Sequence, residues 1–145
     1  MSDPRWLIYA LLSAIAASFV GIFGKIGMKD VDPTLATGIR SVVMTVSLIG
    51  VCYATSVVSR LSTLSHRAMA MIILSGIAGA ASWLFYFRAI QLGTVSQVAP
   101  IDKLSMPLAV ILAVLLLKER PSLLNWFGII LIVTGALLAA IPRVK

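Results

Sequence analysis

The chain has 145 residues, of which 60% are hydrophobic and 12% charged, and its formal net charge at pH 7 is +7. Soluble domains are about half apolar and about a quarter charged, so a soluble core of this size could not hide so many apolar side chains. The basic residues lie in the polar breaks between apolar segments rather than in one patch or stripe, which indicates contact with anionic membrane lipid and no nucleic-acid partner.

The apolar residues are gathered in segments that are long enough to cross a bilayer as helices. In windows of about 19 residues, short polar breaks separate these segments, and no stretch is left for a soluble domain. We therefore predict an all-α polytopic membrane protein that forms a single domain over residues 1–145. Its five transmembrane helices are expected at about 6–24, 33–55, 68–87, 95–117 and 123–141.

The first segment has some features of a secretory signal, with a basic residue at Arg5 and small residues around Ala14 and Ala16. Its apolar run nevertheless continues to Phe23 without a polar cleavage region. Signal peptides have apolar regions of about 7–15 residues, so the sequence favours a retained first helix.

The second segment begins with Pro33, which costs no hydrogen bond in the first turn of a helix, and Asp32 before it is a suitable N-cap. Arg40 follows seven residues after Pro33. At 1.5 Å per residue, this arginine is expected about 10 Å inside the membrane. Charged residues at such depth face a partner, a cavity or a function, so Arg40 is a candidate for the solute pathway.

The third segment carries an aromatic side chain below the interfacial belt of Phe85, Tyr86 and Phe87. Trp83 lies about one turn deeper than this belt, because a helical turn takes about 3.6 residues. It could line a cavity on the solute pathway. The alternative is that Trp83 only packs between helices, as tryptophans at helical spacing commonly do.

The fourth segment contains an ionisable pair, Asp102 and Lys103, between Pro100 and Pro107. A proline inside a helix removes one backbone donor and bends or breaks the helix. We therefore predict a bent or locally unwound helix around Asp102 and Lys103. Secondary transporters place binding sites at such discontinuous helices, so both residues are candidates for the solute pathway.

Arg40 and Asp102 both enter the membrane from the same side if the helices alternate in direction. They are expected at a similar depth, and an ion pair between them would remove much of the cost of burial. Lys103 would then extend toward the interface or meet solute, and Lys25 at the end of the first helix would lie on that side too. The alternative is a purely architectural salt bridge between the second and fourth helices.

Orientation is not decided by the loop charges. Five basic residues fall on each side of the membrane, so the positive-inside rule gives no preference. This balance is typical of a dual-topology protein that pairs with an inverted copy of itself. The alternative is a single orientation set by a partner chain or by features other than charge. The ten residues are Arg5, Arg60, Arg67, Lys118 and Arg120 on one side, and Lys25, Lys29, Arg88, Arg143 and Lys145 on the other.

Enzyme signatures are missing from the sequence. It contains no His-Glu-x-x-His zinc pair and no Gly-x-Ser-x-Gly elbow, and its one histidine, His66, lies in a polar loop. We therefore expect a protein that is not an enzyme, with no catalytic residue, no metal ion and no cofactor.

Several motifs, in this order, resemble the EamA-type branch of the drug/metabolite transporter superfamily, and in particular its small five-helix bacterial and archaeal members. The similarity covers nearly the whole chain. The motifs are Phe23-Gly24-Lys25-Ile26-Gly27, Ala36-Thr37-Gly38-Ile39-Arg40, Tyr86-Phe87-Arg88-Ala89-Ile90-Gln91-Leu92-Gly93, Val98-Ala99-Pro100-Ile101-Asp102-Lys103-Leu104-Ser105 and Leu117-Lys118-Glu119-Arg120, the last followed by Gly128-Ile129-Ile130-Leu131-Ile132.

The resemblance implies a secondary transporter or facilitator of a small metabolite in the cytoplasmic (inner) membrane of a bacterium or archaeon. Ten-helix relatives consist of two inverted halves, so this chain corresponds to one half. An antiparallel homodimer, or a pair with a homologous chain, would complete it. Small multidrug exporters of the superfamily use a glutamate in the first helix, and Trp6–Gly24 contains no acid. The competing hypothesis is a non-transporting membrane scaffold or accessory subunit.

Overall fold

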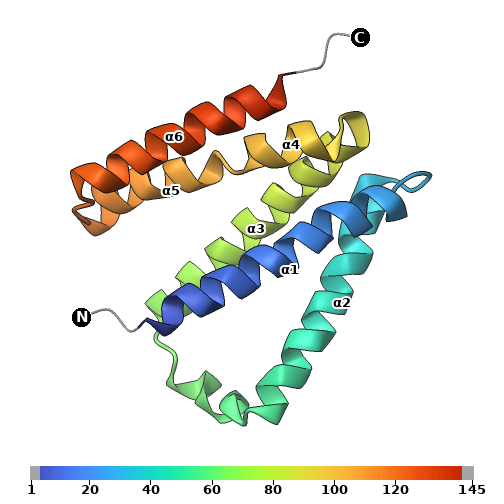
Figure 1. Cartoon of the computed structure of the whole chain (residues 1–145). Helices are drawn as coiled ribbons and strands as arrows, with labels where there is room; N and C mark the ends of the chain where they lie inside the picture. The colour runs from blue at the N-terminus through green and yellow to red at the C-terminus, as the bar shows by residue number, and fades with distance from the viewer. Residues whose placement is uncertain (1–3, 142–145) are drawn as a thin grey trace. The chain divides into compact units, whose positions relative to one another are not determined.

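The computed structural model describes residues 4–141, which are helical throughout apart from short turns and loops. Five stretches are long and apolar enough to span a membrane, namely α1, α2, α3, the composite of α4, α5 and η2, and α6 (Figure 1). The predicted five-helix membrane protein is thus confirmed. The helices are α1 (Arg5–Gly27), α2 (Pro33–Ala54), η1 (Val57–Thr63), α3 (His66–Leu92), α4 (Val95–Asp102), α5 (Ser105–Leu112), η2 (Ala113–Leu117) and α6 (Leu123–Ala140).

The backbone contacts divide the chain into two compact units. One contains residues up to Phe23 together with those from Leu92 onward, and the other is Gly24–Gln91. The division passes through α1, whose last turn belongs to the second unit. The single domain expected over residues 1–145 stays a prediction.

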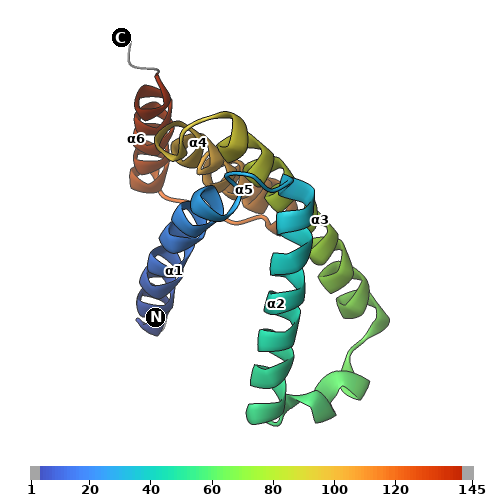
Figure 2. The ribbon, with the colours of Figure 1, turned by 90° about the vertical axis from the view of Figure 1, so that its right-hand side faces the viewer.

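In the first unit, α4, α5 and η2 form one arm of a helical hairpin and α6 forms the other. Both α4 and α5 pack against α6, and Figures 1 and 2 show the two arms side by side. The π-helical turn η2 ends at Lys118, whose φ of 58° is left-handed. Ser122 then caps α6 by accepting a hydrogen bond from the backbone N–H of Asn125 at 3.3 Å. The left-handed residue after η2 and the cap before α6 reverse the direction of the chain between the two arms.

The fourth span is interrupted at Lys103 and Leu104, the place where the two prolines predict a bend. The backbone there forms hydrogen bonds between residues three positions apart. The N–H of Leu104 donates to the carbonyl of Ile101 at 3.0 Å, and the N–H of Met106 donates to that of Lys103 at 3.0 Å. Pro107 falls in the first turn of α5, where a helix needs no donor, and it is buried. The carbonyl of Lys103 is therefore satisfied in spite of the proline.

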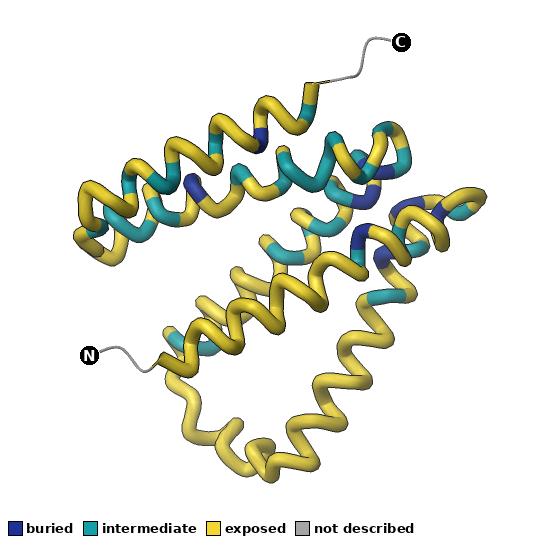
Figure 3. Tube along the Cα trace, viewed as in Figure 1, coloured by how far each residue is buried: buried dark blue, intermediate teal, exposed yellow. Residues whose placement is uncertain are grey.

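In the second unit, α2 and α3 lie close together where α2 begins and separate toward η1 (Figure 2). Asp32 caps α2 as expected, because its Oδ1 accepts the N–H groups of Thr34 at 2.8 Å and Leu35 at 3.2 Å. The few buried residues of this unit gather at the close end, as the dark segments of Figure 3 show. They are Met28, Pro33, Thr37, Phe87 and Ile90.

Most of the helical surface is exposed. In each of the five spans, at most 6% of the most apolar stretch is buried within the protein. In water, this much apolar surface would be costly, at about 25 cal/mol for each Å². The exposed faces are therefore available to lipid and to a partner chain, and the protein is an integral membrane protein.

Candidate functional site

Arg40 lies on the ring of Trp83. The guanidinium carbon is 3.6 Å from the centroid of the Trp83 ring and 5.5 Å from that of Phe87. Arg40 comes from α2 and both rings come from α3, at the end of the second unit where these helices lie close. A cation over an aromatic face is attracted by the quadrupole of the ring, by about 2 kcal/mol or more where water is excluded. The contact fixes a charged group within the second candidate membrane span.

Trp83 belongs to an aromatic cluster on α3. Its ring meets that of Tyr86 edge to face, with centroids 5.6 Å apart, and that of Phe87 at 5.5 Å and a tilt of 56°. Phe87 is only 2% exposed, whereas Trp83 and Tyr86 are half-buried. Phe87 is therefore the buried member of the cluster, and the face of the Trp83 ring contacts Arg40.

Lys25 anchors the end of α1 to α3. Its Nζ donates a hydrogen bond to the backbone carbonyl of Ile90, one turn beyond Phe87. The carbonyl lies near the end of α3, where helices carry partial negative charge. Lys25 therefore has a structural contact close to the aromatic cluster, and its position as a pathway residue stays a prediction.

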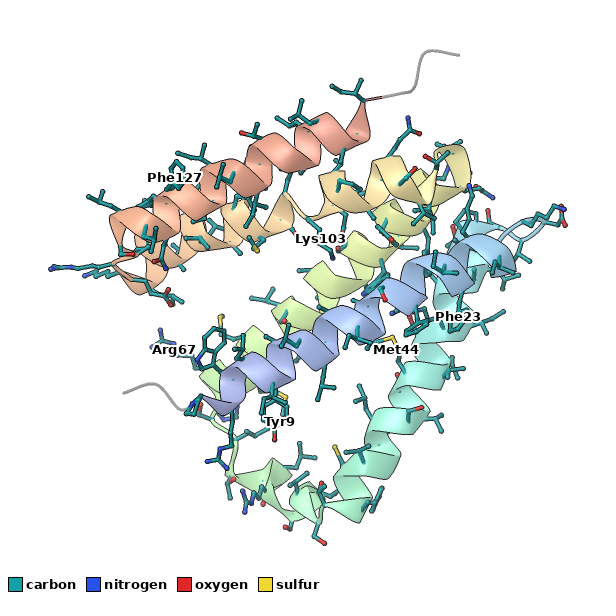
Figure 4. All side chains as sticks on the ribbon, viewed as in Figure 1. Tyr9, Phe23, Met44, Arg67, Lys103 and Phe127 are labelled. Atoms are coloured by element: carbon teal, nitrogen blue, oxygen red, sulfur yellow. The ribbon has the colours of Figure 1, made fainter. Side chains whose placement is uncertain are left out.

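Asp102, the last residue of α4, and Lys103, the first residue of the interruption, form an ion pair. The Nζ of Lys103 lies 3.3 Å from Oδ2 of Asp102, and Figure 4 labels Lys103 at the break between α4 and α5. The side chain of Asp102 is 32% exposed and that of Lys103 is 63% exposed. Neighbouring side chains on a regular helix point about 100° apart, so the irregular turn is what lets them meet. Their opposite charges compensate each other locally.

The expected ion pair between Arg40 and Asp102 stays a prediction, because the two residues belong to different units of the structure. What the structure brings together is Arg40 with Trp83 in one unit, and Asp102 with Lys103 in the other. Each charge has a favourable contact within its own unit. The Trp83 ring packs against Arg40, Tyr86 and Phe87, so packing accounts for its position without excluding a place on the pathway.

The role of Phe87 was missed in the sequence, where it counts as part of an interfacial belt. Phe85 fits that belt, since it is 77% exposed, but Phe87 is buried. The signal that could have separated them is the spacing of four residues between Trp83 and Phe87, which places both rings on one face of a helix. An aromatic pair on one helix face would have predicted the ring cluster, but not its contact with Arg40.

A separate groove of about 580 Å³ lies in the first unit beside the turn from η2 to α6. Its polar lining residues are Glu119, Arg120 and Asn125, and Gly128 and Ile132 also line it. Both Glu119 and Arg120 follow the end of η2. Among residues 4–141, no group of three or more His, Cys, Asp or Glu side chains is placed to hold a metal ion.

Comparison with known proteins relates the chain to membrane transporters. A model of the EamA-like transporter family matches residues 4–141. A curated protein of Sinorhizobium sp, named "Uncharacterized transporter in cobO 3'region", is 41% identical over 139 residues, which cover 96% of this chain and 99% of that protein. No solved structure matches. The resemblance that the motifs indicate is thereby confirmed, and the chain belongs to the EamA-like transporter family.

Proposed function

We propose that the protein is a secondary transporter or facilitator that moves a small polar metabolite across the cytoplasmic membrane of a bacterium or archaeon by alternating access. The observation that carries this proposal is the break in the fourth span, with an ionisable pair at the break. Membership of a transporter family supports it. Charges at membrane depth are costly, and their default interpretation is functional.

The broken span suits such a role. Where a helix is interrupted, backbone groups and charged side chains become accessible to solute inside the membrane. Lys103 is the more exposed member of the pair, at 63% against 32% for Asp102. In this proposal Lys103 meets the solute, while Asp102 holds the lysine at the break.

The transporting unit would contain two chains, either as an antiparallel homodimer or as a pair with a homologous chain. Alternating access between inverted repeats needs two related halves, and this chain supplies five spans. The glycines of α6 support such pairing. No atom of residues 4–141 lies within 4 Å of a Cβ built at Gly128 or Gly135, so these positions could receive a second helix.

Flux into proteoliposomes tests the proposal. Purified protein would be reconstituted and assayed with a library of small labelled metabolites, alongside the Lys103→Ala variant. Lys29→Ala serves as the matched control, because it removes an exposed lysine from the loop between α1 and α2. We expect solute-specific flux that Lys103→Ala lowers and Lys29→Ala leaves unchanged. No flux for any solute, from protein that is folded and dimeric, would favour the scaffold hypothesis.

A further inference from the structure

We infer that Arg40, held on the ring of Trp83, binds the carboxylate of a monoanionic solute with an apolar body. This inference rests on the proposed function and names its solute class. It starts from the geometry of the second unit, where the guanidinium of Arg40 lies 3.6 Å from the Trp83 ring centroid.

Stacking uses the face of the guanidinium and leaves its edge for hydrogen bonds. The group is planar, with five N–H donors arranged around its rim, and it stays charged in proteins. Phe87 is 2% exposed and its ring centroid lies 5.5 Å from that of Trp83, so it restrains the ring on which Arg40 lies. The arginine is therefore held in place before any ligand arrives, and its fork of donors matches the two oxygens of a carboxylate.

The second unit supplies no carboxylate of its own to Arg40. Its acids are Asp30 and Asp32, which both precede α2. Asp32 is occupied in capping that helix and lies about 12 Å from Arg40 along the helix axis, at 1.5 Å per residue. Within its own unit Arg40 therefore has no counter-charge, and a charge at membrane depth favours an anionic partner.

The balance of charge selects a monoanion. Lys25 of the same unit is already engaged, because its Nζ donates to the carbonyl of Ile90. One guanidinium neutralises one negative charge, whereas a dianion such as phosphate would leave a surplus charge at low dielectric. A cationic solute would be repelled. The half-buried ring of Trp83, which contacts the arginine, and that of Tyr86, which contacts Trp83, offer apolar surface to the body of the solute.

Trp83 itself can report binding. The chain contains three tryptophans, Trp6, Trp83 and Trp126, so Trp6→Phe combined with Trp126→Phe leaves Trp83 as the single emitter. This full-length protein, purified in a neutral detergent, would be titrated with benzoate, with neutral benzyl alcohol, with cationic benzylamine and with inorganic phosphate. Benzoate is expected to change the fluorescence of Trp83 in a saturable way, and the other three are expected to bind much more weakly.

The variants test whether the charge of Arg40 is responsible. Arg40→Gln should weaken benzoate binding by about tenfold or more, the effect of losing a charged hydrogen-bonding partner. Arg40→Lys, which keeps the charge, should retain part of the affinity and covers the case in which Arg40→Gln does not fold. Arg88→Gln is the matched control, because it removes an arginine of α3 that hydrogen-bonds to Gln91. The Arg88→Gln variant should bind benzoate with the same affinity as the parent protein.

Several results would overturn the inference. One is equal binding of benzoate and benzyl alcohol, and another is unchanged benzoate affinity in both Arg40 variants. Benzoate binding that appears only after Asp102→Asn would show that Asp102 already neutralises Arg40. A fluorescence change with phosphatidylglycerol micelles but not with benzoate would assign Arg40 to lipid headgroups. Arg40-dependent binding without flux in proteoliposomes would contradict the proposed function and leave this binding site in place.

Discussion

Gly24 of α1 packs directly against the ring of Phe87. A Cβ atom built on Gly24 would lie 2.8 Å from Cε1 of Phe87 and 3.5 Å from Cδ1 of Ile90. Real Cβ atoms do not approach a ring carbon so closely, so the contact requires glycine. Phe87 also supports Trp83, on which Arg40 lies. The packing of one glycine is therefore linked to the position of the intramembrane arginine.

Gly24→Ala should destabilise the protein by overpacking. Phe87 is buried between Gly24 and the Trp83 ring, so it cannot move away from an added methyl group without disturbing the aromatic cluster. Overpacking of this kind costs about 1–3 kcal/mol. Reversible unfolding in mixed detergent micelles, followed by helical circular dichroism, would measure the loss.

Gly27→Ala provides the control for this experiment. It lies three residues further along α1, and no atom of the part of the chain that the structure describes is within 4 Å of a Cβ built there. It should have little effect, or a slight stabilising one, because alanine favours helix more than glycine. Equal stability of the two alanine variants would show that the contact of Gly24 with Phe87 does not limit packing.

Asp32 should give the protein a stability that depends on pH. Hydrogen bonds from the backbone N–H of Leu35 and from Thr34 hold the pKa of this carboxyl below its ordinary value of 3.8, with a smaller contribution from the charge of Arg88. Since the folded pKa is depressed, this contribution is present in full above the unfolded pKa. It is lost as the pH falls through the folded pKa.

Comparison with Asp32→Asn isolates this effect. Asparagine is about as good an N-cap as aspartate but does not titrate. The stability advantage of the parent over Asp32→Asn should shrink when the pH is lowered from about 6 to about 3. Unfolding midpoints measured across this range would show it. An advantage that stays constant with pH would mean that the capping carboxylate is not coupled to folding.

Arg40 and Asp102 remain a predicted pair that a double-mutant cycle can test. If they interact, Asp102→Asn alone should be costly, because it leaves Arg40 without a counter-charge. The two changes together should then cost less than the sum of the single changes, by about 0.5–3 kcal/mol. Unfolding of Asp102→Asn, Arg40→Gln and the double variant would provide the cycle. Additive losses would show that the cation–π contact of Arg40 and the Lys103 contact of Asp102 are independent.

The five spans could be predicted from the sequence because lipid imposes a length and a composition on each helix. Pro33, Pro100 and Pro107 also have local effects that do not depend on distant residues, so the start of α2 and the interruption between α4 and α5 were predictable. The third span extends beyond the predicted 68–87, to His66–Leu92. Polar residues such as Arg88 and Gln91 can continue a helix past the apolar region, which a hydropathy window does not detect.

The site was only partly predictable, because side-chain contacts depend on how two helices are rotated and where they cross. Depth along the helix identified Arg40 and Trp83 as candidates, but nothing local indicates that one lies on the other. Phe85 and Phe87 look alike in composition, yet one is 77% exposed and the other 2%. Contact with Gly24, far away in sequence, is what distinguishes Phe87.

The glycine face of α6 should mediate pairing of two chains. Gly128 and Gly135 are seven residues apart, and both positions are open in the structure. Gly135→Leu should weaken the dimer in mild detergent, because close backbone approach needs small residues. Crosslinking and mass measurement would give the dimer fraction, with Gly50→Leu on α2, an equally open position, as the control. A protein that transports as a monomer would contradict the proposed pairing.

The balance of loop charges predicts that the chain inserts in both orientations. With five basic residues on each side, neither orientation is favoured, and a small added charge should shift the ratio. Reporters of cytoplasmic and external location, fused after Lys145, should both be active in the parent protein. Two lysines added near Arg5 should retain the N-terminal side in the cytoplasm. Because five spans place Lys145 on the opposite side, the signal of the external reporter should then rise and that of the cytoplasmic reporter should fall. Two added glutamates should have little effect. One fixed population that ignores the added lysines would show that a feature other than charge, such as a partner chain, sets the orientation.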